Sequence, residues 1–171
     1  RNFHYYLCRQ LKGGGMEINM RKLMCVMLSC MMLLGLTACG GEEEVKNAAV
    51  GTFEQNGITI TMSFDAKGDK VTRLTQKSVI PTEGYTEEQL QALREVVDQA
   101  AATYDDFESV EYTSEEEEGQ MVETIVIPTD EETLKQVVEA GLLPVDDENV
   151  TELSLEQTKK NLEDTGWTFE E

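Results

Sequence analysis

The stretch ITITMSF, residues 58–64, alternates large apolar side chains with Thr and Ser. A period of two is typical of a β-strand with one buried and one solvated face. The turn-forming residues 65–69 follow it, and residues 71–80 return as a second strand. Upstream, residues 50–55 precede Asn56-Gly57, a dipeptide that favours a tight hairpin. The sequence therefore predicts a three-stranded antiparallel meander.

A helix is expected directly after the meander. Thr86 and Gln89 form a capping-box pattern, which marks a helix start. The apolar residues behind them recur at helical spacing over about five turns. They are Leu90, Leu93, Val96, Val97, Ala100, Ala101 and Tyr104. This stripe is expected to pack on the apolar face of the meander.

The second half of the chain repeats this order in smaller form. Residues 110–113 and residues 121–127 have the composition of two strands. The acidic run of residues 115–119 is expected to join them as a turn. A second hairpin is therefore predicted.

Two helices are expected after this hairpin. Thr129 with Glu132 is typical of a helix cap, and Gly141 is expected to end that helix. Ser154 with Gln157 predicts the start of the last helix. Three strands, a helix, two strands and two helices with short connections indicate an α+β fold. We expect an antiparallel sheet of about five strands with the helices packed on one face.

The chain is strongly acidic. Its 171 residues include 34 Asp and Glu against 14 Lys and Arg, a net charge of −20. A nucleic-acid-binding protein must place cations along phosphates, so nucleic acid is excluded as a partner. Attachment to an anionic membrane through a basic patch is excluded for the same reason.

Residues 20–38 have the pattern of a secretory signal peptide. Arg21 and Lys22 are positive, residues 23–36 carry no charge, and small residues follow at the expected cleavage point. A helix that spans a membrane needs about 20 apolar residues, so this segment is too short to be one. Residues 20–38 are therefore expected to be removed.

The residues at the cleavage point, Leu36-Thr37-Ala38-Cys39, resemble the bacterial lipobox. The resemblance implies cleavage before Cys39 and a diacylglyceryl group on its sulfur. Two acyl chains hold a protein on a membrane, whereas one binds only reversibly. The expected location is extracytoplasmic, anchored to the bacterial cell membrane through Cys39. The alternative is a soluble secreted protein in which Cys39 is a free thiol.

The signal peptide divides the rest of the chain. Residues 1–19 begin with Arg1 and are expected to be upstream read-through or a leader, with translation starting at Met16 or Met20. Residues 39–50 are expected to be the lipidated Cys and an acidic tether. Residues 51–171 are expected to form one α+β domain.

Cleavage before Cys39 also limits the chemistry available. His4, Cys8, Cys25 and Cys30 all precede it, so the mature chain has one Cys and no His. A Cys/His zinc site and a nucleophile activated by His are therefore excluded. Five of the 14 basic residues and one of the 34 acidic residues are lost as well, which leaves a net charge of −24. No enzyme activity and no cofactor are expected.

The order of several motifs resembles a known family, the YehR-like bacterial lipoproteins. The motifs are TFEQNG at residues 52–57, GDKV at residues 68–71, Gln76, VET at residues 122–124 and Gly166-Trp167. The resemblance covers about residues 51–169 and includes the lipobox. It implies a compact α+β domain tethered to a bacterial envelope, and it brings no catalytic residues. The acidic run at residues 115–118 departs from the more mixed charge expected there.

Two acids near the first turn are candidate metal ligands. Asp65 and Asp69 flank a Gly and could bind Ca²⁺ through carboxylate and carbonyl oxygens. An EF-hand loop would need a Glu at its twelfth position, where Gln76 stands. A plain hairpin turn is the favoured explanation, and residues 115–118 are likewise expected to be solvated surface.

Three functions fit these observations. The first is a non-catalytic binding or accessory module of the envelope, monomeric, with an envelope protein as its partner. The second is a small-solute-binding lipoprotein associated with a transporter. The third is a cell-wall hydrolase that uses carboxylates alone, for which two acids would have to face each other about 5–10 Å apart.

Overall fold

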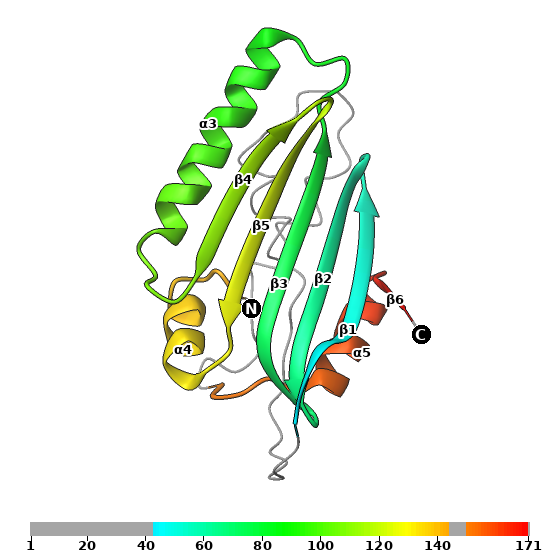
Figure 1. Cartoon of the computed structure of the whole chain (residues 1–171), viewed down its shortest axis with the longest axis vertical. Coiled ribbons are helices and arrows are strands. Elements are labelled where there is room, and N and C mark those ends of the chain that lie inside the picture. Colours follow the sequence, from blue (N-terminus) through cyan, green and yellow to red (C-terminus); the bar gives the residue numbers. More distant parts are fainter. Residues whose placement is uncertain (1–42, 144–149, 171) are drawn as a thin grey trace, which may run out of the picture.

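The computed structural model describes residues 43–143 and 150–170, and its centre is a six-stranded antiparallel sheet (Figure 1). The strands are β1 (Glu44–Gln55), β2 (Ile58–Lys67), β3 (Lys70–Pro81), β4 (Glu111–Glu117), β5 (Gln120–Pro128) and β6 (Thr168–Phe169). The helices are α3 (Glu87–Tyr104), α4 (Glu131–Glu139) and α5 (Leu155–Asp164). The spatial order of the strands is β4-β5-β3-β2-β1-β6. The α+β class is confirmed, but the sheet has six strands rather than about five.

The predicted meander is present and longer than expected. Asn56 and Gly57 have φ values of 54° and 81°, the left-handed region that a tight hairpin turn requires. Strand β1 begins at Glu44, so residues 44–50 belong to the sheet and not to a flexible tether. Asp65 lies in β2, and the turn that follows is shorter than residues 65–69.

The second hairpin differs from the prediction in its turn. Residues 115–117 belong to β4, which leaves only Glu118-Gly119 between the strands. Strand β5 pairs with β3 over nine residues, and β4 pairs with β5 at the outside of the sheet. The acidic residues therefore occupy an exposed outer strand, where charge discourages pairing with another chain.

Strand β6 was not predicted from the sequence. Thr168 and Phe169 pair with Thr52 and Gly51 of β1. A Cβ on Gly51 would lie 2.8 Å from Cζ of Phe169, so the ring of Phe169 occupies the space that Gly51 leaves open. This contact fastens the end of the chain to the sheet.

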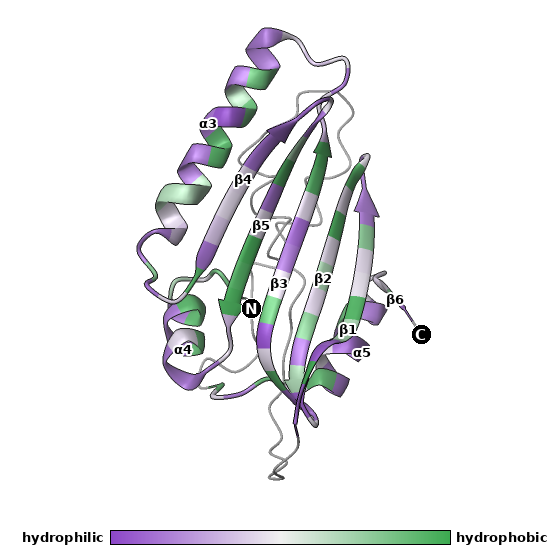
Figure 2. Cartoon of the chain, viewed as in Figure 1, coloured by the Kyte–Doolittle hydropathy of each residue, from purple (hydrophilic) through white to green (hydrophobic). Residues whose placement is uncertain are grey.

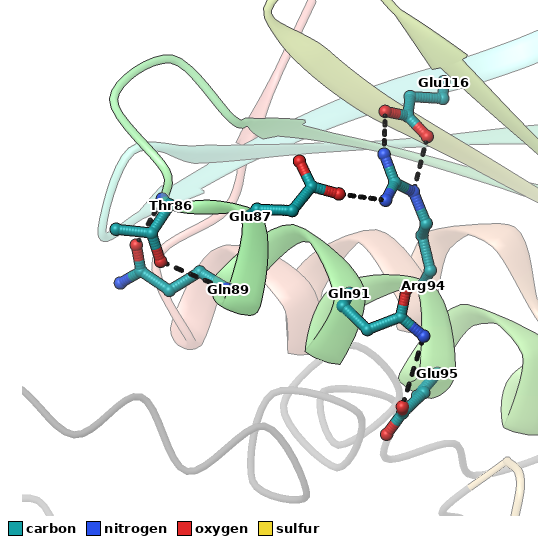
Figure 3. Close-up of polar contacts among 7 residues, drawn as sticks. All are labelled: Thr86, Glu87, Gln89, Gln91, Arg94, Glu95 and Glu116. Atoms are coloured by element: carbon teal, nitrogen blue, oxygen red, sulfur yellow. Dashed lines mark hydrogen bonds and ion pairs between the residues drawn. The ribbon is translucent and has the colours of Figure 1, made fainter.

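Helix α3 begins with the predicted capping box, but its position was predicted wrongly. It lies along β4 rather than on the first three strands (Figure 1). Arg94 holds it there through Nε and Nη2, which donate to the two carboxylate oxygens of Glu116 at 2.9 and 2.8 Å (Figure 3). The aromatic rings of Tyr104 and Tyr112 stack 5.4 Å apart beneath the helix. The prediction failed because β5 pairs with β3 and moves β4, the strand after the helix, one place further out.

The cap of α4 is Asp130, one residue after the predicted Thr129. The carboxylate of Asp130 accepts the backbone N–H of Thr133 at 3.0 Å. Thr129 is buried and donates instead to the carbonyl of Val71 at 2.6 Å. Ser154 caps α5 as predicted, accepting the N–H of Gln157 at 3.1 Å.

The two faces of the sheet differ in polarity. Ile60, Met62 and Phe64 of β2 point to the inner face and are almost fully buried, whereas the Thr and Ser between them are partly exposed. Figure 2 shows the same alternation of hydrophobic and hydrophilic residues along β2 and β3. Helix α3 and the segment after α5 pack on this inner face, through Tyr112 and Phe53 respectively. In the described part of the chain, no helix is long and apolar enough to cross a membrane.

Candidate functional site

The outer face of the sheet is the side without the aromatic core. Its side chains form rows across the strands where the register is regular, away from the shifts at Val45/Ala49 and Asp65/Ala66. One row consists of Thr52, Thr61, Lys77, Thr124 and Thr113. Figure 1 looks onto this face, with α5 passing behind β1. Most of these side chains are partly or fully exposed.

A groove of about 370 Å³ crosses the outer face at the end of the sheet where β1 begins and β5 ends. It is open to solvent and draws its lining from β1, β2, β3, β4 and β5 together. The lining residues are Lys46, Asn47, Ser63, Asp65, Arg73, Thr75, Ser109, Glu111, Val126 and Pro128. Two cations, two acids and three hydroxyl groups thus surround one small volume, near the lower limit for a ligand site.

Asp65 is held rigidly at one side of the groove. Its Oδ1 accepts the backbone N–H of Asn47 at 2.9 Å, and its Oδ2 accepts Lys46 Nζ at 3.0 Å. Asn47 has a φ of 49°, and the register between β1 and β2 shifts there, which turns its N–H toward Asp65. Lys46 also pairs with Glu44 at 3.0 Å. The hydrogen bonds that Lys46 donates to Glu44 and then to Asp65 raise the pKa of Lys46, so this cation stays charged.

Arg73 and Glu111 line the same groove without such partners. Arg73 lies opposite Asp65 in the β2–β3 register and opposite Pro128 in the β3–β5 register. Glu111 lies opposite Val126, one strand further out. Within residues 43–143 and 150–170, neither side chain makes an ion pair or a side-chain hydrogen bond. The groove therefore offers one positive and one negative group to a ligand.

The two predicted metal ligands have separate structural roles. Asp65 lies in the groove, whereas Asp69 sits in the turn and caps α5. Among the described residues, no group of three or more acids has the arrangement of a metal site. The segment is a hairpin, with Asp65 in β2 and Asp69 in the turn before β3.

A buried acid on the inner face was missed by the sequence reasoning. Glu123 is 7% exposed and accepts a hydrogen bond from the hydroxyl of Tyr112. Ser78 lies opposite Glu123 in the register, and Gln76 Nε2 is 3.5 Å from Ser78 Oγ. Burial raises the pKa of Glu123, and the hydrogen bond from Tyr112 partly opposes this rise. The available signal was a Glu at an apolar position of an alternating strand, between Met121 and Ile125.

The acids of the two faces have different surroundings. Glu111 faces the outer groove, whereas Glu123 faces the core on the other side of the sheet. Asp65 is engaged by Lys46 and Asn47. The predicted lipidation site, Cys39, and the lipobox residues Leu36, Thr37 and Ala38 lie outside the described residues, as do the leader and the signal peptide.

Similar proteins show to which family the chain belongs. The model of a family described as "Protein of unknown function (DUF1307)" matches residues 51–168. The chain is 24% identical over 151 residues to the uncharacterized lipoprotein Lmo0207 of Listeria monocytogenes, covering 86% of this chain and 95% of the relative. It also resembles the NMR structure of Escherichia coli YehR, with a TM-score of 0.57 and 18% identity over 76% of this chain and 93% of that one.

A second NMR structure, of a protein from Streptococcus pneumoniae, matches with a TM-score of 0.49 and 13% identity, covering 82% of this chain and 93% of that one. The likeness to YehR shows a shared fold, and the family match covers most of the described domain. The resemblance predicted from the sequence motifs is confirmed: the chain belongs to the DUF1307 family of YehR-like lipoproteins.

Proposed function

We propose that this protein is a membrane-anchored, extracytoplasmic lipoprotein that acts as a non-catalytic binding or accessory module of the cell envelope. Its docking surface is the outer face of the sheet. The anchor is a diacylglyceryl group on Cys39, and the partner is an envelope protein. The protein acts as a monomer.

The outer face carries this proposal. Five strands contribute to it, and the described helices α3 and α5 pack on the opposite, inner face. Its partly exposed Thr and Val side chains can be buried by a partner at small cost, because they are already ordered by the sheet. The groove with Arg73 and Glu111 gives this face a polar feature by which a partner would be selected.

The short connection to the anchor restricts how the domain sits. Four residues separate Cys39 from Glu44, the first residue of β1, and the five Cα-to-Cα steps span at most about 18 Å. Lys46 and Asn47, near the same end of β1, line the groove. With Cys39 lipidated, the groove therefore lies at the end of the sheet nearest the membrane.

A second candidate function is a small-solute-binding lipoprotein associated with a transporter. The groove supports it, because its volume suits a small polar solute better than a protein side chain. A carboxylate-only cell-wall hydrolase has less support, because Glu123 faces the other side of the sheet and Asp65, which shares the groove with Glu111, is engaged by Lys46 and Asn47. The two binding functions differ in the size of what occupies the outer face.

The anchor is tested by replacing Cys39 with Ala and following the protein through detergent-phase partitioning. The expected result is transfer from the detergent phase to the aqueous phase. Cys30→Ala is the matched control, since Cys30 lies in the segment expected to be cleaved, and it leaves partitioning unchanged. Retention in the detergent phase of a Cys39→Ala protein whose mass shows that residues 20–38 have been removed would refute the lipid anchor.

The binding role is tested by crosslinking intact membranes and isolating the lipidated protein. A single partner at fixed stoichiometry, lost when outer-face side chains are replaced, supports the accessory module. If no protein is crosslinked and the isolated lipoprotein instead retains a radiolabelled small solute, the solute-binding alternative is favoured. Adducts that are unaffected by outer-face substitutions contradict the proposed surface.

A further inference from the structure

The charges of the outer groove divide into a satisfied pair and an open pair. Lys46 and Asp65 neutralise each other through a 3.0 Å contact, and Glu44 adds a second contact to Lys46. Arg73 and Glu111 have no such contacts among the described residues. One guanidinium and one carboxylate, those of Arg73 and Glu111, therefore face the same volume unpaired by any described residue.

Arg73 and Glu111 stand apart on the sheet, and they make no ion pair with each other. They stand on β3 and β4, with β5 between them, so their backbones are about 10 Å apart across the sheet. Arg73 lies opposite Pro128 and Glu111 opposite Val126, which adds an offset of two residues along the strands. A molecule in the groove can bridge the two side chains by carrying opposite charges at its two ends.

The rest of the lining suits the same kind of molecule. Ser63, Thr75 and Ser109 supply hydroxyl groups that can donate to a carboxylate or accept from an ammonium group. Val126 and Pro128 give an apolar strip between the two charged groups. A guanidinium binds a carboxylate through two parallel hydrogen bonds, which fixes the direction in which such a molecule enters.

We infer that the groove binds a small zwitterion, with the ligand's carboxylate on Arg73 and its ammonium group on Glu111. A free α-amino acid and a short peptide with both termini share this chemistry. The inference deepens the solute-binding candidate and requires neither the lipid anchor nor a protein partner. In a chain of net charge −20, a carboxylate ligand would otherwise be repelled, so Arg73 is the group that makes its binding favourable.

The test uses the lipidated mature protein in detergent micelles and measures affinity by calorimetry or ligand-observed NMR. The probes are L-alanine, L-alanyl-L-alanine, acetate and methylammonium. One of the two zwitterions is expected to bind at least about tenfold more tightly than either single ion. Comparing L-alanine with L-alanyl-L-alanine tells a free amino acid from a peptide.

Matched variants identify the groove as the site. R73Q and E111Q are each expected to weaken zwitterion binding by about tenfold, because each removes a charge-assisted contact. K77Q and E115Q change exposed charges on the same two strands outside the groove, and they are expected to leave affinity unchanged. Unchanged circular dichroism spectra confirm that all four variants are folded.

Three results would overturn the inference. Acetate binding as tightly as the zwitterions, with E111Q silent, would make this an anion site. Methylammonium binding as tightly, with R73Q silent, would make it a cation site. Absence of binding by all four probes at millimolar concentration would refute zwitterion binding in the groove. It would leave the crosslinking test of the accessory module unaffected.

Discussion

Ser154 donates a hydrogen bond of 2.6 Å from its hydroxyl to Asp69, although the two residues are 85 positions apart in the chain. Asp69 also accepts the backbone N–H groups of Glu156 and Leu155, at 2.8 and 2.7 Å. The turn between β2 and β3 therefore caps the first turn of α5. A negative charge at this end of a helix is also favoured by the helix dipole.

Replacement of Asp69 by Ala is expected to lower the free energy of unfolding by about 1–2 kcal/mol, since it removes the carboxylate that accepts the Glu156 N–H and the Ser154 hydroxyl. Urea denaturation measures the change. Asp106→Ala, at an exposed position, is the control and is expected to change stability by less than about 0.5 kcal/mol. Equal effects of the two substitutions would mean that the cap does not stabilise the fold.

Replacement of Gly51 by Ala is expected to displace Phe169, because the new Cβ would lie 2.8 Å from its ring. The expected cost is about 1–3 kcal/mol. Phe169→Ala removes the obstacle, so adding Gly51→Ala to that variant is expected to cost much less. Thermal unfolding of the two single variants and the double variant measures this coupling, and strict additivity would contradict the contact.

Replacement of Glu123 by Gln is expected to make stability less dependent on pH. Burial raises the pKa of Glu123 in the folded protein above its value in the unfolded chain, about 4.5. This carboxyl therefore contributes stability below that pH, and the contribution is lost as pH rises through the raised pKa. The Gln variant keeps an acceptor for Tyr112 and avoids the buried charge, so it is expected to be the more stable protein at pH 7.

The difference in unfolding free energy between Glu123→Gln and the parent is measured from pH 4 to pH 8 by denaturation. It is expected to grow in favour of the variant as pH rises. Glu115→Gln, on the exposed strand β4, is the control and is expected to show no such trend. A flat difference for Glu123→Gln would contradict the effect of burial.

Replacement of Arg94 by Gln is expected to loosen α3 without unfolding the domain. Arg94 joins the helix to Glu116 of β4 by two hydrogen bonds, but both side chains are substantially exposed. Solvent and salt screen such pairs, so the change in global stability is expected to be small. Faster hydrogen exchange of α3 amides, with unchanged exchange in β2 and β3, is the expected result, and Glu116→Gln is expected to reproduce it.

Much of the fold could be predicted because its signals are local. The alternation in residues 58–64, the Asn56-Gly57 turn and the Thr86–Gln89 capping box each fix backbone conformation through neighbouring residues. The family resemblance also came from short motifs in a fixed order. These features need no knowledge of distant contacts.

The errors share a different cause, namely pairing between distant segments. The two residues of β6 carry no strand signal by themselves and depend on Gly51 and Thr52 of β1. Thr129 and Asp130 are both residue types that cap helices. The hydroxyl of Thr129 donates to the carbonyl of Val71 in β3, so Asp130 is the cap. The position of α3 depended on which strand β5 joins.

The candidate groove could not be predicted for the same reason. Its lining comes from five strands that are far apart in the sequence. Lys46 lies in β1, whereas the sequence predicts a tether there. The sequence marks Asp65 only as a candidate metal ligand, and its partners Lys46 and Asn47 are brought to it by the β1–β2 pairing. Arg73 is a candidate ligand contact only because Glu111, two strands away, lines the same groove.

The central claim is that the outer sheet face is the docking surface of a membrane-tethered module. Its most direct test places a photoreactive amino acid at Lys77, exposed in the middle of this face, and at Gln99, exposed on α3. Both proteins are produced in the native membrane and irradiated. One discrete adduct from position 77 and none from position 99 is the predicted result; equal adducts from both positions, or none from position 77, would contradict it.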